Sequence, residues 1–237
     1  MDDQDEAFEQ LRGGHGLLRE LPGVRVWGVD DGALVLGEDA THFVFCHQGA
    51  LTVRQNGAWP HVLTPGMFAS APGKCEVRPV GQDLSRGMVI SALGWLGMMV
   101  IGGPLEERGR LRYIDGCTDS LLVSPVRLGD PCLNGLWFPM GTQQTMHTHP
   151  SVRIGMVVRG RGECVTRQGR HLLQPGVMFV IHPDGEHCFR TGADAGLTVV
   201  AWHPDSDCGP TDQEHPMLNR TMVEGVSAAL RPELQTR

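Results

Sequence analysis

The stretch from Met146 to Gly160, M-H-T-H-P-S-V-R-I-G-M-V-V-R-G, places His147 and His149 one residue apart before an apolar run. Successive side chains of an extended chain alternate between faces, so the two imidazoles point the same way and can bind one ion. Neutral imidazoles suit zinc, iron, copper or nickel. Four residues after His149, where a carboxylate commonly completes such a site, stands Arg153. The stretch therefore predicts a metal site with a cation beside it.

A third ligand has to come from a neighbouring strand. His187 is the candidate, because it follows a Pro-Asp-Gly turn in the segment I-H-P-D-G-E-H-C-F. A facial set of three imidazoles leaves coordination positions open for a substrate. His182, five residues earlier, is a candidate proton shuttle beside the site or simply a residue at a strand end. The alternative for the whole set is three unrelated surface or core histidines.

Composition favours a chain of short strands and tight turns. Among 237 residues there are 32 glycines and 16 prolines, and aromatic residues make up only 5%. Short apolar segments are separated by glycine, proline or asparagine, which is typical of β-strands and turns. Helical spacing occurs only at Glu6–Leu11, with a turn around Val226–Leu230. We therefore expect an all-β fold.

The two halves of the chain repeat one pattern. The segments T-V-R-Q-N-G (52–57) and L-T-P-G-M-F (63–68) correspond to V-T-R-Q-G (165–169) and L-Q-P-G-V-M-F (173–179). Such self-similarity indicates one β-unit used twice. The expected organisation is an acidic N-terminal arm (1–20), a first β-unit (21–115), a second, metal-binding β-unit (116–204) and a polar C-terminal tail (205–237).

Charge and cysteine content limit the partners that we expect. The formal net charge of −7 disfavours nucleic acid. No run of 18 or more apolar residues exists, so no membrane partner is expected. The N-terminus is acidic rather than basic and apolar, and the seven cysteines are odd in number without paired spacing. These features favour a reducing, cytoplasmic location.

The second half resembles the cupin superfamily. Its first motif has glycine, His-x-His, a glutamate and a closing glycine, and its second runs from glycine through a proline turn to histidine. The matching positions are Gly141, His147, His149, Arg153 in place of the glutamate, Gly160, Gly176, Pro183 and His187. The first half resembles a degenerate second copy without ligands. There His42 stands alone in the glutamate position, and Lys74-Cys75-Glu76 replaces the third histidine.

This resemblance implies a bicupin: two tandem double-stranded β-helix (jelly-roll) barrels with one divalent ion per chain. Iron(II) is the favoured ion, with zinc, nickel, manganese, cobalt or copper as alternatives. The ligand-free barrel would be structural and could form the contact of a homodimer. Three-histidine cupins include gentisate-type, diketone and thiol dioxygenases, in which the substrate chelates iron and oxygen binds beside it. The stretch around His147 is also similar to the bicupin isomerase of bacilysin biosynthesis.

Arg153 adds a charge argument of its own. Three neutral imidazoles leave a divalent ion's charge uncompensated, and the guanidinium adds another positive charge. Two cations in a low-dielectric barrel repel by several kcal/mol, so we expect an anionic ligand held partly by Arg153. In the alternative, Arg153 turns outward to Glu163 or Glu186. The leading function is a dioxygenase-like enzyme for a small anionic substrate; a redox-neutral isomerase or lyase and a non-catalytic binding protein are the alternatives.

Overall fold

The computed structural model describes residues 6–55, 57–81 and 84–236, and within these ranges the chain forms β-strands and short 3-10 turns without an α-helix. The first half contains β2 (Gly16–Leu21), β3 (Val24–Val29), β4 (Leu34–Leu36), β5 (Ala40–Gln48), β6 (Leu51–Gln55), β7 (His61–Leu63), β8 (Phe68–Pro72), β9 (Cys75–Pro79), β10 (Arg86–Leu93) and β11 (Val100–Gly102). The second contains β12 (Leu111–Arg112), η1 (Ile114–Gly116), β13 (Thr118–Val123), β14 (Cys132–Phe138), β15 (Arg153–Gly160), β16 (Gly162–Thr166), β17 (Arg170–Leu173), β18 (Met178–Ile181), β19 (His187–Arg190) and β20 (Leu197–His203). The all-β prediction is confirmed.

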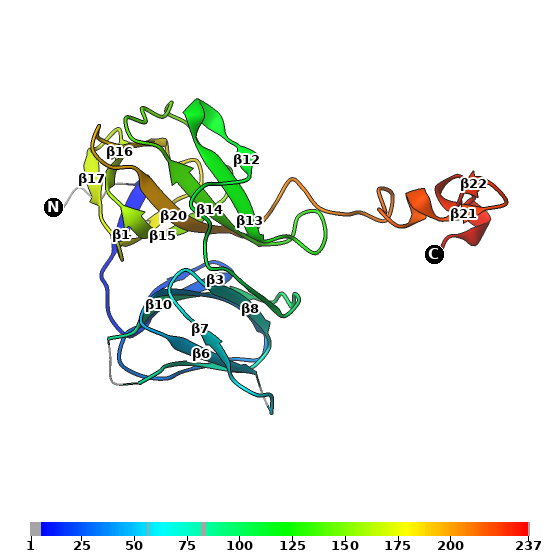
Figure 1. The fold of residues 1–237 in the computed structure, drawn as a ribbon, viewed down its shortest axis with the longest axis horizontal. Coiled ribbons are helices and arrows are strands. Elements are labelled where there is room, and N and C mark those ends of the chain that lie inside the picture. Colours follow the sequence, from blue (N-terminus) through cyan, green and yellow to red (C-terminus); the bar gives the residue numbers. More distant parts are fainter. Residues whose placement is uncertain (1–5, 56, 82–83, 237) are drawn as a thin grey trace.

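The sequence repeat corresponds to two barrels of matching topology, which lie one above the other in Figure 1. The larger sheet of the first barrel contains the order β8-β5-β10-β3, and that of the second contains β18-β15-β20-β14. The smaller sheets are β4-β9-β6-β7 and β17-β16-β19. All pairings between these strands are antiparallel. The same alternation of apolar and polar residues has therefore produced the same sandwich twice.

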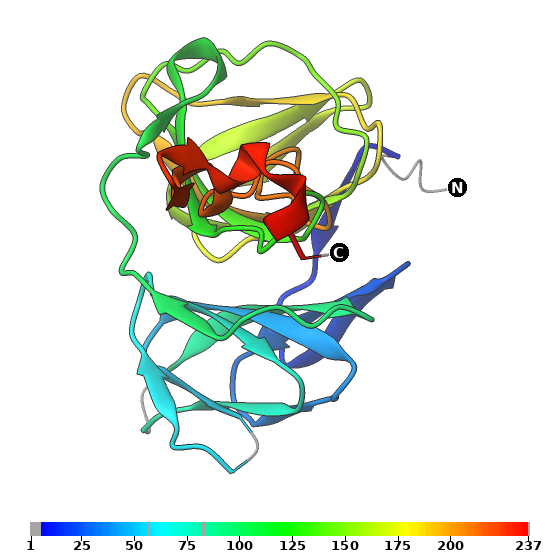
Figure 2. The ribbon, with the colours of Figure 1, turned by 90° about the vertical axis from the view of Figure 1, so that its right-hand side faces the viewer.

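The first described residues do not form the expected helix. Residues Phe8–Leu11 are a strand, β1, which pairs antiparallel with β18 of the second barrel, so the helix prediction for Glu6–Leu11 is wrong. Phe8 is only 3% exposed and stacks on Phe179, with 5.5 Å between ring centroids. Pairing with an open sheet edge outweighs local helix preference. The described part of the expected arm thus lies in two sheets, since β2 follows in the first barrel (Figure 2).

Three apolar clusters fill the molecule. One lies inside each barrel, and the third, which includes Phe45, Trp202 and Met156, joins the large sheets of the two barrels. Along β15, Ile154 and Met156 belong to the joining cluster, whereas Val157 belongs to the interior of the second barrel. Odd-numbered residues at the start of β15 therefore face into that barrel.

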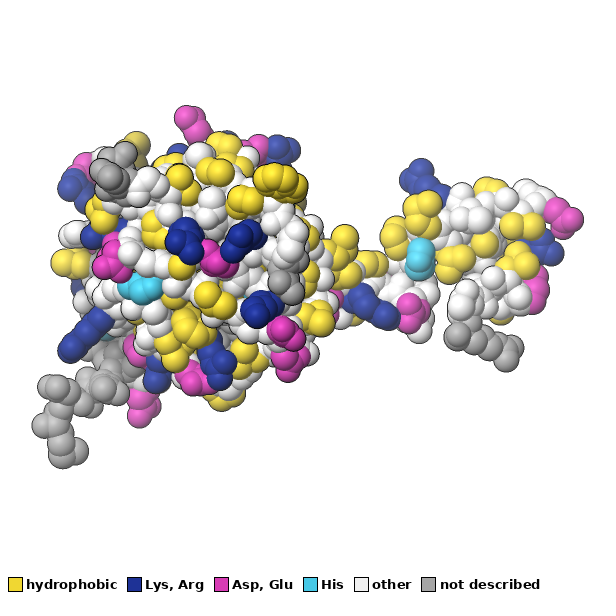
Figure 3. Space-filling view, turned by 90° about the horizontal axis from the view of Figure 1, so that it is seen from below, with side chains coloured by type: hydrophobic (Ala, Val, Ile, Leu, Met, Phe, Trp, Pro, Cys, Tyr) yellow, Lys and Arg dark blue, Asp and Glu magenta, His cyan; other side chains and the backbone are white. Residues whose placement is uncertain are grey.

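The C-terminal segment leaves the second barrel after β20 and extends away from both barrels (Figures 1 and 3). It contains η2 (Leu218–Arg220), β21 (Met222–Val223), β22 (Val226–Ser227), η3 (Ala228–Leu230) and η4 (Pro232–Leu234). The expected turn near residues 226–230 is present as η3. Several large apolar side chains on this segment are exposed, among them Met217 and Leu230. No described helix is long and apolar enough to cross a membrane.

Candidate metal centre

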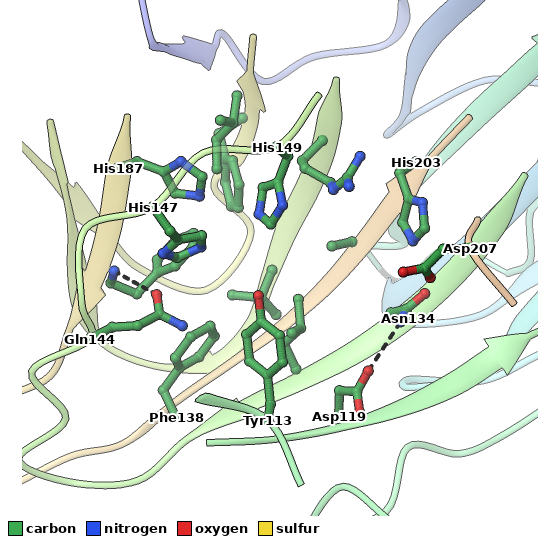
Figure 4. A pocket seen from close by; sticks show the side chains of 17 residues that line it. Tyr113, Asp119, Asn134, Phe138, Gln144, His147, His149, His187, His203 and Asp207 are labelled. Atoms are coloured by element: carbon green, nitrogen blue, oxygen red, sulfur yellow. Dashed lines mark hydrogen bonds between the residues drawn. The ribbon is translucent and has the colours of Figure 1, made fainter. Parts of the chain in front are cut away.

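The three predicted ligands converge at one end of the second barrel (Figure 4). One ring nitrogen from each of His147, His149 and His187 lies within 4.8 Å of the other two, and the ring centroids are 4.6 to 5.3 Å apart. Three imidazole nitrogens at such separations are a donor set that suits a borderline transition-metal ion. The residues present therefore fit a single ion.

Backbone pairing brings the ligands together. His147 and His149 were expected in a regular strand. They lie instead in an extended loop between β14 and β15. His147 and His187 exchange two backbone hydrogen bonds of 3.0 Å, which form an isolated bridge to the start of β19. The extended backbone preserves the alternation, so His149 still shares the face of His147.

Hydrogen bonds set which ring nitrogen is free. Nδ1 of His147 lies 2.8 Å from the carbonyl oxygen of Thr145, and Nδ1 of His187 lies 2.8 Å from that of Gly185. A carbonyl only accepts, so each Nδ1 carries the proton and each Nε2 keeps its lone pair. A carbonyl partner that fixes the tautomer in this way is typical of metal-ligating histidines.

The electrostatic environment also keeps two of the imidazoles, those of His149 and His187, neutral. Burial, assisted by the charge of Arg153, lowers the pKa of His149 to about 3. Burial likewise lowers the pKa of His187 to about 4, although its bond to the Gly185 carbonyl opposes the shift. Neutral imidazole is the form that binds a metal, so two of the three ligands are ready at neutral pH.

Arg153 opens β15 and lines the same cavity as the three histidines. Its side chain is 18% exposed, and Nη1 donates to Ser151 Oγ at 2.6 Å and to the carbonyl oxygens of Ser151 and Val152 at 3.2 Å. The nearest carboxylate is that of Asp205, 3.8 Å from Nη1 and half-exposed. The outward pairings do not occur, because Glu163 pairs with Arg170 and Glu186 with Arg167.

The cavity has a volume of about 210 Å³ and combines apolar walls with a few polar groups. Phe138, Phe179 and Phe189 belong to the core of the second barrel and also form part of the cavity wall. The remaining lining residues are Tyr113, Asp119, Asn134, Leu136, Gln144, His147, His149, Arg153, Ile181, His187, Val199, Ala201, His203 and Asp207. A space of this size accommodates a small molecule only.

Several polar residues that line the cavity were not predicted from the sequence. Asn134 donates to Asp119 at 3.3 Å, and burial raises the pKa of Asp119. Tyr113 comes from the segment before η1, on the same side of the cavity in Figure 4. Of these residues, Asn134 could have been recognised as a candidate for the site, because it is a polar residue at an inward position of the apolar strand C-L-N-G-L-W-F.

His182 directly follows β18, which is the strand-end position given as one of its two alternatives. It is not among the described residues that line the cavity, so the geometry does not support the other alternative, a proton shuttle beside the site. Its Nε2 lies 3.4 Å from a carboxylate oxygen of Glu9, in β1. Ile181 faces the barrel interior, so alternation places the side chain of His182 on the opposite face of the sheet, which Glu9 of β1 shares. His203, at the end of β20, lines the cavity.

Side chains fill the interior of the first barrel, at the place where the second barrel has its cavity. Its interior contains Leu51, Val53 and Leu63, all fully buried. His42, at the position of the cupin glutamate, is buried, with Nδ1 2.8 Å from Ser91 Oγ and Nε2 3.0 Å from the Gly37 carbonyl oxygen. Both ring nitrogens are thus engaged in structural hydrogen bonds.

Comparison with known proteins agrees with this architecture. Residues 139–206 match the family model of the AraC-like ligand-binding domain. No curated protein matches the sequence significantly. Similar solved structures include protein YlbA from E. coli (TM-score 0.63, 13% identity, 88% of this chain and 94% of that chain covered) and a putative glyoxylate-induced protein from Pseudomonas aeruginosa (0.61, 14%, 86% and 94%).

A third similar structure is salicylate 1,2-dioxygenase from Pseudaminobacter salicylatoxidans, with a TM-score of 0.59 and 13% identity over 77% of this chain and 71% of that chain. At these identities the likeness concerns the fold. The duplicated topology, the cupin motif residues and the structural matches agree. The chain has the cupin fold, with two barrels in tandem as in a bicupin.

Proposed function

We propose that the protein is a mononuclear metal-dependent oxygenase that acts on a small anionic substrate in the second barrel. The observation that carries this proposal is the convergence of His147, His149 and His187 without a carboxylate ligand, next to the guanidinium of Arg153. Bound there, an ion such as iron(II) would supply the redox chemistry that oxygen activation requires.

The residues of the cavity favour an anion. The three imidazole ligands add no negative charge, and Arg153 is mostly buried while its Asp205 neighbour is half-exposed to water, which screens that carboxylate. Asp119 and Asp207 also line the cavity and carry at most two negative charges, against the three positive charges of a bound divalent ion and Arg153, so the loaded site would keep a positive charge. A carboxylate or enolate would relieve the repulsion and could accept two hydrogen bonds from the guanidinium.

The walls favour a compact, partly apolar substrate. Phe138, Phe179 and Phe189 exclude water from the inner side of the cavity, which strengthens the electrostatic interactions inside it. The neighbour named salicylate 1,2-dioxygenase supports this class of reaction by analogy of fold only.

An oxygen electrode tests the proposal. Protein purified and loaded with iron(II) under anaerobic conditions is mixed with small carboxylic acids, including hydroxy and oxo acids, and oxygen uptake is recorded. We expect uptake that depends on one acid class and that is lost in His187→Ala. Turnover of an acid under strict anaerobiosis would contradict an oxygenase.

One observation favours a second candidate, a redox-neutral isomerase or lyase. Asp119 lines the cavity, and burial raises the pKa of its carboxyl group above the ordinary value, which is the direction that favours a general acid or base. An ion held by the three histidines would supply the Lewis acidity that such a reaction needs. Asp119→Asn would abolish anaerobic turnover while leaving metal content unchanged. Binding of acids without any turnover would instead indicate a small-molecule-binding protein, in keeping with the matched ligand-binding family.

A further inference from the structure

We propose that the side-chain amide of Gln144 donates a hydrogen bond to an oxygen atom of the ligand at the triad, and so selects ligands with an acceptor at that point. This inference rests on the proposed function, because it assumes a metal-bound anion in the cavity. It adds a second recognition element beside Arg153.

The orientation of the Gln144 amide follows from its partner. The backbone N–H of Phe189 donates to Gln144 Oε1 at 3.1 Å, inside the barrel wall. A backbone N–H only donates, so the oxygen must face it and the nitrogen must point elsewhere. Figure 4 shows the amide nitrogen on the side away from this bond, below the ring of His147.

The Gln144 nitrogen has no protein partner. The residue is only 4% exposed, and Nε2 is buried without a hydrogen bond. The other described residues with buried, unpartnered side-chain atoms are Arg19, His47, Arg190 and Trp202, and none of them lines this cavity. Leaving a buried donor unpaired is unfavourable, and proteins tolerate it mainly where another molecule completes the bond.

The position of Gln144 brings that donor close to the triad. Gln144 pairs through its backbone with Phe189, the nitrogen donating to the Phe189 carbonyl at 3.2 Å. Phe189 lies two residues beyond His187, which is a strand distance of about 7 Å. The bond from the Phe189 N–H to Gln144 Oε1 holds the amide beside this strand, in the wall of the cavity that the triad also lines, so a ligand of a few atoms at the metal can reach Nε2. Arg153 approaches from β15, on another wall of the cavity.

The chemistry of this arrangement is selective. A carboxylate, hydroxyl or carbonyl oxygen accepts the bond from Nε2, whereas an ammonium group or a methyl group in the same place leaves the donor buried and unpaired. With Arg153, the ligand therefore offers oxygen atoms to two donors as well as to the ion. Gln144 is a specificity-determining residue in this proposal.

The test uses cobalt-loaded full-length protein and oxalate as the probe, with the cobalt absorption bands reporting binding. Gln144→Glu keeps an oxygen for the Phe189 N–H but replaces the donor with a second acceptor. Gln144→Met removes both polar atoms at similar length. Gln143→Glu is the matched control, since Gln143 is exposed and faces a different surface depression.

We expect the wild-type protein and Gln143→Glu to bind oxalate equally. Gln144→Glu and Gln144→Met should weaken binding by at least about tenfold, the value of one hydrogen bond to a charged group, with cobalt content unchanged. Equal oxalate affinity in Gln144→Glu with cobalt retained would overturn this inference and leave the proposed function standing. Cobalt-loaded wild type that does not bind oxalate would also overturn the inference alone. Failure of the wild type to hold cobalt at all would overturn the proposed function.

Discussion

Replacing Arg153 with glutamine should change the affinities for metal and for anion in opposite directions. The guanidinium repels the ion and attracts the anion, so its removal should raise the affinity for the metal and lower the affinity for the anion. Arg153 and the triad line one small cavity, and at an effective dielectric of about 20 a divalent ion and a unit charge about 7 Å apart repel by about 5 kcal/mol. Side-chain relaxation and the nearby carboxylate reduce this value.

We therefore expect Arg153→Gln to bind cobalt or zinc at least about tenfold more tightly, a change of about 1.4 kcal/mol or more. Oxalate should bind the loaded variant at least about tenfold more weakly, because the bidentate cationic partner is gone. Competition with a chromophoric chelator measures the first affinity, and titration of the cobalt bands measures the second.

Asp205→Asn supplies the control of opposite sign. It removes the carboxylate 3.8 Å from Nη1, half-exposed and therefore screened, so metal should bind slightly more weakly and oxalate slightly more tightly. If Arg153→Gln weakened both metal and anion binding, or left both unchanged, the charge argument would be refuted.

Three further predictions concern stability and packing. Burial lowers the pKa of His149 to about 3 and that of His187 to about 4, against 6.5 in the unfolded chain. Below pH 6.5 the unfolded protein therefore binds more protons than the folded protein. The metal-free protein should lose stability as pH falls from about 6.5 toward 4. His187 alone accounts for at most about 3 kcal/mol, and urea unfolding at several pH values should detect it, whereas a flat profile would contradict the assigned burial. Gly155→Ala would place Cβ closer to Cζ of Phe179 than van der Waals contact allows. Thermal unfolding should therefore show a loss of stability of about 1–3 kcal/mol, and oxalate binding should weaken as the ring moves into the cavity. Unchanged stability and affinity would mean that the ring has room to move away. Phe8→Ala should cost about 3 kcal/mol by chemical unfolding, and an effect below about 0.5 kcal/mol would mean that β1 is not packed on the barrel.

Local patterns allowed most of the fold to be predicted. Strand alternation and turn residues repeat in the two halves, so the strands could be predicted, and the resemblance to cupins implied how they are arranged, since neighbours in the large sheets such as β5 and β10 are not consecutive along the chain. The His147, His149 and His187 set could be predicted because the spacing of the ligands reflects one face of an extended segment and one turn. The direction of Arg153 followed from parity, which β15 preserves.

The remaining features depend on contacts between distant segments. Nothing near Phe8 indicates that it pairs with β18, because the open edge belongs to a strand about 170 residues away. The same pairing explains why His182 faces Glu9 rather than the cavity. Asp119 and Gln144 carry no spacing signal, since each becomes part of the site only when three strands and a loop close around it.

The metal stoichiometry of the purified protein and of its triad variants tests the central claim most directly. Elemental analysis after anaerobic purification, followed by cobalt titration, should give one ion per chain in the wild type and a loss of that ion in His147→Ala, His149→Ala and His187→Ala. Each variant should retain its fold, because the first barrel and the joining core do not depend on the ligands. Stoichiometric metal that survives all three substitutions, or wild-type protein that binds no transition-metal ion, would contradict the account.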